Sequence, residues 1–232
     1  MNITVVGASG LIGTKVVELL RAQGHDVVAA SRSSGVDVLT GAGLADALAG
    51  ADVLVAVTDS PNLAGGPAME FFSASATNLV EAASRAGVGH FVALSIVGVD
   101  ALPDSGYFRA KVAQEKIITA SGIPNSIVRA TQFAEFTDAI TESMTDGDEV
   151  RVPNALIQPT PADRVASAVA GAAVATPLNG IVNIGGPDKI TFEQMARDAL
   201  ARKGDNTKTI VVDPEAGYYG AALHTRSLVT PE

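Results

Sequence analysis

The strongest constraint in this sequence is a glycine-rich turn between a strand and a helix. Residues 1–6 form a short run rich in β-branched side chains, and Gly7, Gly10 and Gly13 follow in the spacing G-x-x-G-x-x-G. An amphipathic stretch over residues 11–23 comes directly after it. Gly7 permits a sharp exit from the strand, and Gly10 lets backbone amides approach a phosphate at the positive end of the helix. A dinucleotide-phosphate site requires this order of elements.

The same glycines also fit a plainer interpretation, a tight strand-to-helix turn without a ligand. The flanking strand and helix favour the phosphate site. In the phosphate-site interpretation, Gly13 lets the helix lie close to the sheet, and Ser9, Leu11 and Ile12 complete the turn around the cofactor.

Composition limits the classes of protein that the chain can represent. With 232 residues and 47% hydrophobic residues, it fits one domain with a sizeable core, or one domain with a small appendage. The net charge of −9 repels phosphate backbones, so nucleic acid is not an expected partner. The absence of cysteine excludes disulfides, thiol nucleophiles and zinc–thiolate sites. We see no leader and no apolar run of about 18 residues, and we expect a soluble, cytoplasmic protein without membrane contact.

Strand-like and helix-like segments alternate along most of the chain, which predicts βα units around a parallel sheet. The nearly continuous apolar run at residues 52–57 is typical of a strand buried on both faces. The other predicted strands cover residues 27–30, 36–39, 91–94 and 126–129. The predicted helices cover residues 43–48, 68–86 and 107–121. The fold class is therefore α/β, a doubly wound parallel sheet.

Prolines divide the final third into shorter pieces. We expect helices over residues 161–175 and 191–202 and strands over residues 181–184 and 209–212, with a capping box at the start of the second helix. This part has neither a low-complexity linker nor an internal repeat, so it is predicted to pack beside the sheet as a lid.

A second informative place combines Ser95, Tyr107 and Lys111. Ser95 stands at the carboxyl end of a predicted buried strand, where open α/β sheets bind their ligands. Tyr107 and Lys111 are four residues apart and face the same side of a helix. An ammonium beside a phenol favours the phenolate and moves its pKa from about 10 toward neutral pH, and a serine hydroxyl can orient the reacting oxygen. The plain alternative is a partly buried tyrosine beside a solvated lysine.

With the glycine turn, these residues give the chain a family resemblance. It resembles the short-chain dehydrogenase/reductases, nearest to their atypical, NmrA-like NAD(P)-binding branch. The glycine turn matches the cofactor motif, and Ser95, Tyr107 and Lys111 match the Ser and Tyr-x-x-x-Lys of active members. The likeness extends to about residue 186. It implies a Rossmann-like NAD(P)-binding core over residues 1–152, followed by residues 153–232, which combine core-completing elements with a substrate-side lid in one compact domain.

The resemblance also implies roles for these residues. Tyr107 would be the acid/base, Lys111 would bind the nicotinamide ribose and lower the tyrosine pKa, and Ser95 would polarise the substrate oxygen. Relatives often carry an asparagine that holds a relay water; that position falls here near Phe72, with Asn78 two turns later. Relatives also show Arg-Pro-Gly after the sixth strand. This chain has Arg-Ala-Thr-Gln-Phe at residues 129–133, with Ala130 and Thr131 expected at the cofactor and Gln132 and Phe133 at the substrate.

The end of the second predicted strand bears on cofactor choice. NAD-specific folds place an acid there to hold the ribose 2′-hydroxyl. Here Arg32 offers a guanidinium to a 2′-phosphate, and Ser31 and Ser33 offer hydroxyls. We therefore predict NADP(H), with NAD(H) as the alternative if Asp37 serves as a displaced ribose ligand. Arg32 as a solvated surface residue is the plain alternative.

The remaining candidate residues indicate less about function. In residues 58–61, only the backbone and Thr58 are expected to contact the cofactor. The histidines lie apart without carboxylate partners, so no metal site is expected. Of the adjacent Tyr218 and Tyr219, at most one is expected to line a pocket, because neighbours on a regular element point in different directions.

These observations predict an NADPH-dependent oxidoreductase that reduces a ketone, aldehyde or quinone, with Tyr107 as the proton donor. One alternative is a non-catalytic NADP(H) sensor, which would not need Ser95, Tyr107 and Lys111 together. Another is a nucleotide-sugar epimerase or dehydratase, which the short segment after Gly186 disfavours. A homodimer through the two long helices is compatible with the sequence and not required by it.

Overall fold

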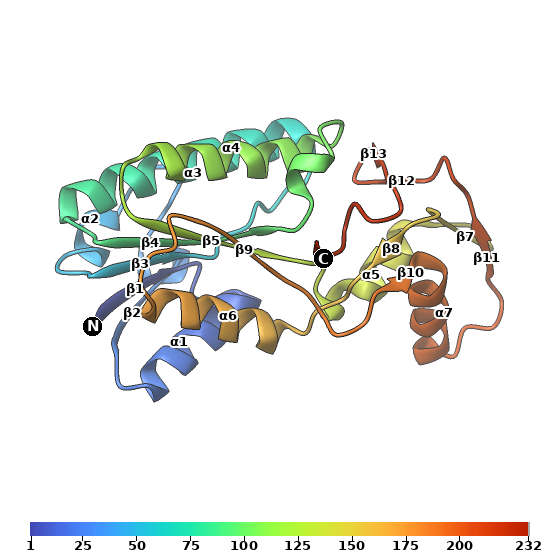
Figure 1. The fold of residues 1–232 in the computed structure, drawn as a ribbon, viewed down its shortest axis with the longest axis horizontal. Helices are drawn as coiled ribbons and strands as arrows, with labels where there is room; N and C mark the ends of the chain where they lie inside the picture. The colour runs from blue at the N-terminus through green and yellow to red at the C-terminus, as the bar shows by residue number, and fades with distance from the viewer. Residues whose placement is uncertain (232) are drawn as a thin grey trace.

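The computed structural model describes residues 1–231 and contains a six-stranded parallel sheet with helices on both faces (Figure 1). The strand order is β2-β1-β3-β4-β5-β9, and every neighbouring pair is parallel. The strands are β1 (Asn2–Val6), β2 (Asp26–Ala30), β3 (Val53–Ala56), β4 (His90–Ile96), β5 (Asn125–Ala130) and β9 (Gly180–Ile184). This architecture confirms the predicted Rossmann-like fold class.

Two pairs of helices cover the sheet. α3 (Gly65–Ala86) and α4 (Gly106–Ala120) lie on one face, and α1 (Leu11–Ala22) and α6 (Ala162–Val174) lie on the other (Figure 1). The four central strands are buried on both faces because each face packs against its own apolar cluster, one including Leu54 and Phe91 and the other including Val5 and Val92. The short helix α2 (Leu44–Ala47) joins the α3 side.

A third core lies beyond the carboxyl ends of the strands (Figure 1). It contains Phe192, Val150 and Tyr218, together with Phe108 from α4. Its elements are the 3-10 turns η2 (Val99–Ala101) and η3 (Ala134–Phe136), the helices α5 (Thr137–Ser143) and α7 (Phe192–Lys203), and the short strands β6 (Thr145–Asp146), β7 (Glu149–Val152), β8 (Leu156–Ile157), β10 (Ile190–Thr191), β11 (Thr209–Val212), β12 (Gly217–Tyr218) and β13 (Ala221–Ala222). This layer covers the strand ends where a ligand is expected.

One predicted strand is wrong. Residues 36–39 form no strand; they follow the 3-10 turn η1 (Arg32–Ser34) and Gly35, which has a positive φ of 83°. Val36 and Val38 are nevertheless buried in the α3-side core. Their alternation therefore reflects packing under a loop. Within residues 1–231, none of the helices combines the length and apolar character needed to cross a bilayer.

Candidate functional site

A cleft of about 810 Å³ opens at the carboxyl ends of the central strands. β2 lies beside β1 in one direction along the sheet, and β3 lies beside β1 in the other direction. The strand order therefore reverses at β1. Open α/β sheets bind their ligands at such a reversal. Of the predicted site residues, those that line the cleft are Gly7, Ser9, Gly10, Leu11, Ile12, Ser31, Arg32, Thr58, Ser95, Tyr107, Lys111, Ala130, Thr131, Gln132 and Phe133.

The glycine turn closes tightly on itself. Gly7 has a φ of 92°, and a Cβ added there would lie 2.9 Å from the Val57 carbonyl oxygen in the loop after β3. A Cβ on Gly13 would lie 2.1 Å from the Gly7 carbonyl oxygen, which also accepts a hydrogen bond from the Gly10 amide at 3.0 Å. Gly13 therefore lies behind the cleft and fixes α1 against the turn. Gly10 caps α1 without a side chain, so no side-chain acceptor engages its first amides.

Arg32 lies at the edge of the cleft beyond β2. It is exposed, and within residues 1–231 no carboxylate pairs with it. The Ser31 hydroxyl pairs with the Ser33 hydroxyl at 2.8 Å, and Ser33 itself does not line the cleft. Asp37 also lies outside the cleft, where its carboxylate accepts a hydrogen bond from the Leu39 amide at 2.8 Å. The basic group is therefore closer to the cofactor end of the cleft than the acid.

Three buried polar atoms in the cleft wall have no hydrogen-bond partner among the described residues. They are Ser95 Oγ, Thr58 Oγ1 and Gln132 Oε1. A buried polar atom without a partner costs free energy. Ser95 is only 4% exposed and sits on β4, where its backbone pairs in register with β5. These atoms suit a site whose ligand completes their hydrogen bonds.

The Tyr107 hydroxyl is held by an acid from another element. It donates a hydrogen bond to Asp59 Oδ1 at 3.0 Å, and its ring packs against Phe72 and Tyr219. Burial raises the pKa of Tyr107 far above its ordinary value, and the neighbouring Asp59 carboxylate raises it further. The phenol is therefore kept protonated. The sequence analysis did not identify Asp59 as a site residue, although its carboxylate contacts Tyr107.

Lys111 is buried one helical turn beyond Tyr107. Its Nζ donates to the Leu94 carbonyl oxygen at 3.0 Å and to Gln114 Oε1 at 2.5 Å, and it lies 4.4 Å from the centre of the Phe72 ring. Burial lowers the pKa of Lys111 to about 8. The amine is bonded to the protein rather than to the phenol, and it contributes no lowering of the Tyr107 pKa. The expected lowering of the tyrosine pKa by Lys111 is therefore wrong in this structure.

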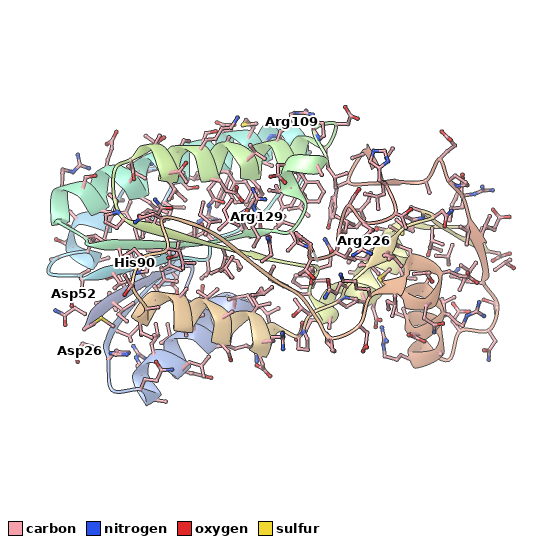
Figure 2. All side chains as sticks on the ribbon, viewed as in Figure 1. Asp26, Asp52, His90, Arg109, Arg129 and Arg226 are labelled. Carbon is pink, nitrogen blue, oxygen red and sulfur yellow. The ribbon has the colours of Figure 1, made fainter. Side chains whose placement is uncertain are left out.

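A buried ion pair that the sequence analysis missed fixes α4 on the sheet. Arg129, on β5, donates from Nε and Nη2 to the two carboxylate oxygens of Glu115 at 2.9 and 2.6 Å. Its remaining nitrogen, Nη1, contacts Asp100 at 3.1 Å. Figure 2 shows Arg129 between the sheet and the helix layer of α4. Glu115 follows Lys111 by one turn, so this pair sets the position of the helix that carries Tyr107 and Lys111.

Phe72 and Asn78 lie in different surroundings. Phe72 packs beneath Lys111 and against Tyr107. Asn78 donates to the Val38 and Leu39 carbonyl oxygens, both at 2.9 Å, and does not line the cleft. A phenyl ring thus lies where the resemblance would place a relay asparagine.

Tyr218 and Tyr219 both line the cleft, so the expectation of at most one is wrong. Tyr219 has a positive φ of 48° at the turn between β12 and β13. This left-handed backbone breaks the alternation of side chains, and the two rings lie with centroids 4.6 Å apart. No sequence pattern indicates this conformation, because non-glycine residues rarely adopt a positive φ.

Comparisons with known proteins agree with the geometry. Residues 7–177 match a family described as NAD(P)H-binding. A dTDP-4-dehydrorhamnose reductase from Clostridium acetobutylicum has a TM-score of 0.74 at 17% identity, covering 95% of this chain and 87% of that one. A NADPH-dependent quinone oxidoreductase from Escherichia coli has a TM-score of 0.67 at 21% identity, covering 90% and 77%. MoeE5 in complex with UDP-glucose and NAD has a TM-score of 0.71 at 20% identity, covering 91% and 85%. These likenesses establish a shared fold. No curated protein matches the sequence.

Proposed function

The chain belongs to the NAD(P)H-binding family, and from this membership we propose that it is an NADPH-dependent oxidoreductase that reduces a ketone, an aldehyde or a quinone. One observation carries the proposal. A single cleft joins the glycine turn to Ser95 and Tyr107, and the Ser95 hydroxyl in its wall is buried without a partner.

The cofactor end of the cleft fits NADP(H). The turn at Gly10 offers uncapped amides to the pyrophosphate. Arg32 offers a cation to the 2′-phosphate, and Thr58 offers a buried hydroxyl oxygen that lacks a partner. Ala130 and Thr131 line the same cleft, and we expect them to border the nicotinamide. When bound, the cofactor supplies the hydride for the reduction.

The residues of the chain would bind the carbonyl oxygen and supply its proton. Ser95 Oγ would donate a hydrogen bond to that oxygen, and Tyr107 Oη would transfer its proton to it. A phenol that is kept protonated by burial and by Asp59 is a proton donor. This state suits reduction better than oxidation, which would need the phenolate as a base.

A non-catalytic NADP(H) sensor is the second candidate. The observation that favours it is the engaged Lys111 amine, which is bonded to Leu94 and Gln114 instead of projecting freely into the cleft. A sensor would use the cofactor end and leave Ser95 and Tyr107 without a chemical task.

Kinetics on a broad panel of carbonyl compounds and quinones, with NADPH and NADH in parallel, separates the two candidates. An enzyme oxidises NADPH with at least one member of the panel, whereas a sensor oxidises none. For the enzyme, Tyr107→Phe should retain NADPH binding and lose turnover by at least about 100-fold, because the proton donor is removed. Unchanged turnover in Tyr107→Phe would refute the assigned role.

A further inference from the structure

Aromatic side chains dominate the substrate end of the cleft. From the β12–β13 hairpin, Tyr219 lies 5.6 Å from Tyr107 and 6.3 Å from Phe108, measured between ring centroids. Tyr218 packs against Phe108 and Tyr219, with ring centroids 6.3 and 4.6 Å away. Tyr219 is 43% exposed, whereas Phe108 and Tyr218 are buried. One wall of the cleft is therefore a set of contacting aromatic rings with an open face.

A second aromatic pair lines the cleft from the segment after β5. Phe133 and Phe136 lie with ring centroids 5.5 Å apart, and both line the cleft. Phe136 is 47% exposed. Leu63 and Ile140 add apolar surface to the same space. Exposed aromatic rings that line one cleft mark a binding surface.

The charged residues at the substrate end of the cleft disfavour an anionic ligand. Apart from the tyrosines, the ionisable residues that line it are Arg32, Asp59 and Lys111. Arg32 lies beyond β2 at the cofactor end, and the Lys111 amine is buried against Leu94. The exposed Asp59 carboxylate lies beside the Tyr107 hydroxyl. A diphosphate or carboxylate next to Tyr107 would meet a negative charge and no free cation, whereas anion sites are built with arginine or lysine.

From these contacts we infer that the substrate is an uncharged aromatic carbonyl compound, whose flat ring stacks on the Tyr219 and Phe136 side chains while its carbonyl oxygen points to Ser95 and Tyr107. The inference rests on the proposed function and narrows it, since it excludes nucleotide sugars and keto acids. Offset stacking on aromatic rings supplies affinity without charge. The polar groups at the bottom of the cleft then fix the orientation of the ring.

Tyrosine fluorescence offers a direct test without cofactor. The chain has three tyrosines and no tryptophan, and Tyr107, Tyr218 and Tyr219 all line the cleft. A naphthyl ring bound there should quench nearly all of the intrinsic emission. The matched probes are 2-acetylnaphthalene and 6-acetyl-2-naphthoate, which differ by one carboxylate, with UDP-glucose as a third ligand. Free N-acetyltyrosinamide corrects for absorption by the probes.

We expect the neutral ketone to bind at least tenfold more tightly than its carboxylate analogue, and UDP-glucose not to compete with it. Phe136→Ala should weaken the ketone about fivefold, because one stacking contact is worth about 1 kcal/mol. Leu178→Ala, which truncates an apolar side chain that is 55% exposed outside the cleft, should leave binding unchanged. Circular dichroism verifies the fold of each variant. Equal binding of the neutral and anionic probes, or an unaffected Phe136→Ala, would overturn the inference.

The fluorescence titration and the kinetic panel together separate this inference from the proposed function. Selective ketone binding without any NADPH oxidation would refute the proposed enzymatic activity and support the aromatic binding site. Turnover of aliphatic or anionic carbonyls at the same rate as aromatic ones would retain the enzyme and refute the substrate class.

Discussion

The contact between Gly13 and Gly7 leads to a prediction with a built-in control. Gly13→Ala places a Cβ 2.1 Å from the Gly7 carbonyl oxygen, and real Cβ atoms essentially never come within 3.0 Å of such an atom, so the turn must open by at least 0.9 Å. Gly171 is also helical, in α6, but nothing lies within 4 Å of its added Cβ. The same substitution at the two positions therefore differs in its steric consequence.

Both substitutions gain helix propensity, about 0.5–1 kcal/mol relative to glycine. Gly171→Ala should keep that gain and raise the melting temperature by about 1–4 °C, since 1 kcal/mol corresponds to about 2–4 °C in a domain of this size. At Gly13 the clash costs about 1–3 kcal/mol, which leaves a net loss of up to about 2.5 kcal/mol and a fall of up to about 10 °C. The same opening disturbs the amides at Gly10, so NADPH affinity should fall about tenfold.

Calorimetry gives the melting temperatures of both variants, and titration by NADPH fluorescence gives their affinities. A Gly13→Ala protein as stable as Gly171→Ala, with wild-type affinity for NADPH, would show that the turn does not depend on this contact. A variant that loses stability but keeps its affinity would separate packing of α1 from cofactor binding.

Three further predictions concern charged residues. Arg32→Ala should weaken NADPH binding about tenfold more than NADH binding in fluorescence titrations, because only NADPH carries the 2′-phosphate; equal losses would contradict that contact. Arg129→Met should cost about 3–5 kcal/mol in urea unfolding because it leaves the Glu115 carboxylate buried without its partner, while Arg129→Met/Glu115→Met should recover most of the loss, and additive losses would argue against a coupled pair. The Lys111 pKa of about 8 lies below its unfolded value near 10.5, so the cost of burying its charge is full below pH 8 and disappears toward pH 10.5. Relative to Lys111→Met, the wild type should gain about 3 kcal/mol over that range, and parallel stability curves would refute the depressed pKa.

Sequence patterns predict the strand, glycine turn and helix at the start of the chain well because their signals are local. The β1 strand, the glycine turn and α1 are consecutive, and the β-branched run and the helical period lie within 22 residues. The apolar run at residues 52–57 likewise predicts β3, since a strand buried on both faces needs apolar residues throughout.

The other half depends on contacts between distant residues. Asp59 and Tyr107 are 48 residues apart, and no periodic pattern links them. The predicted strand at residues 36–39 failed because Val36 and Val38 alternate as strand residues do, while their partners are core side chains instead of a neighbouring strand. Tyr219 was misjudged for a backbone reason, since its left-handed conformation is imposed by the hairpin turn.

One part of the cleft wall comes from a late stretch of the chain. The glycine turn, Ser95 and Tyr107 fall within residues 7–177, which match the NAD(P)H-binding family, whereas Tyr218 and Tyr219 lie beyond that match. A mutational library restricted to residues 213–222 would therefore vary the part of the cleft wall that Tyr218 and Tyr219 form, and leave the glycine turn unchanged. The fold offers a modular starting point for directed evolution, in which new ligand preferences can be selected while the NAD(P)H-binding segment stays constant.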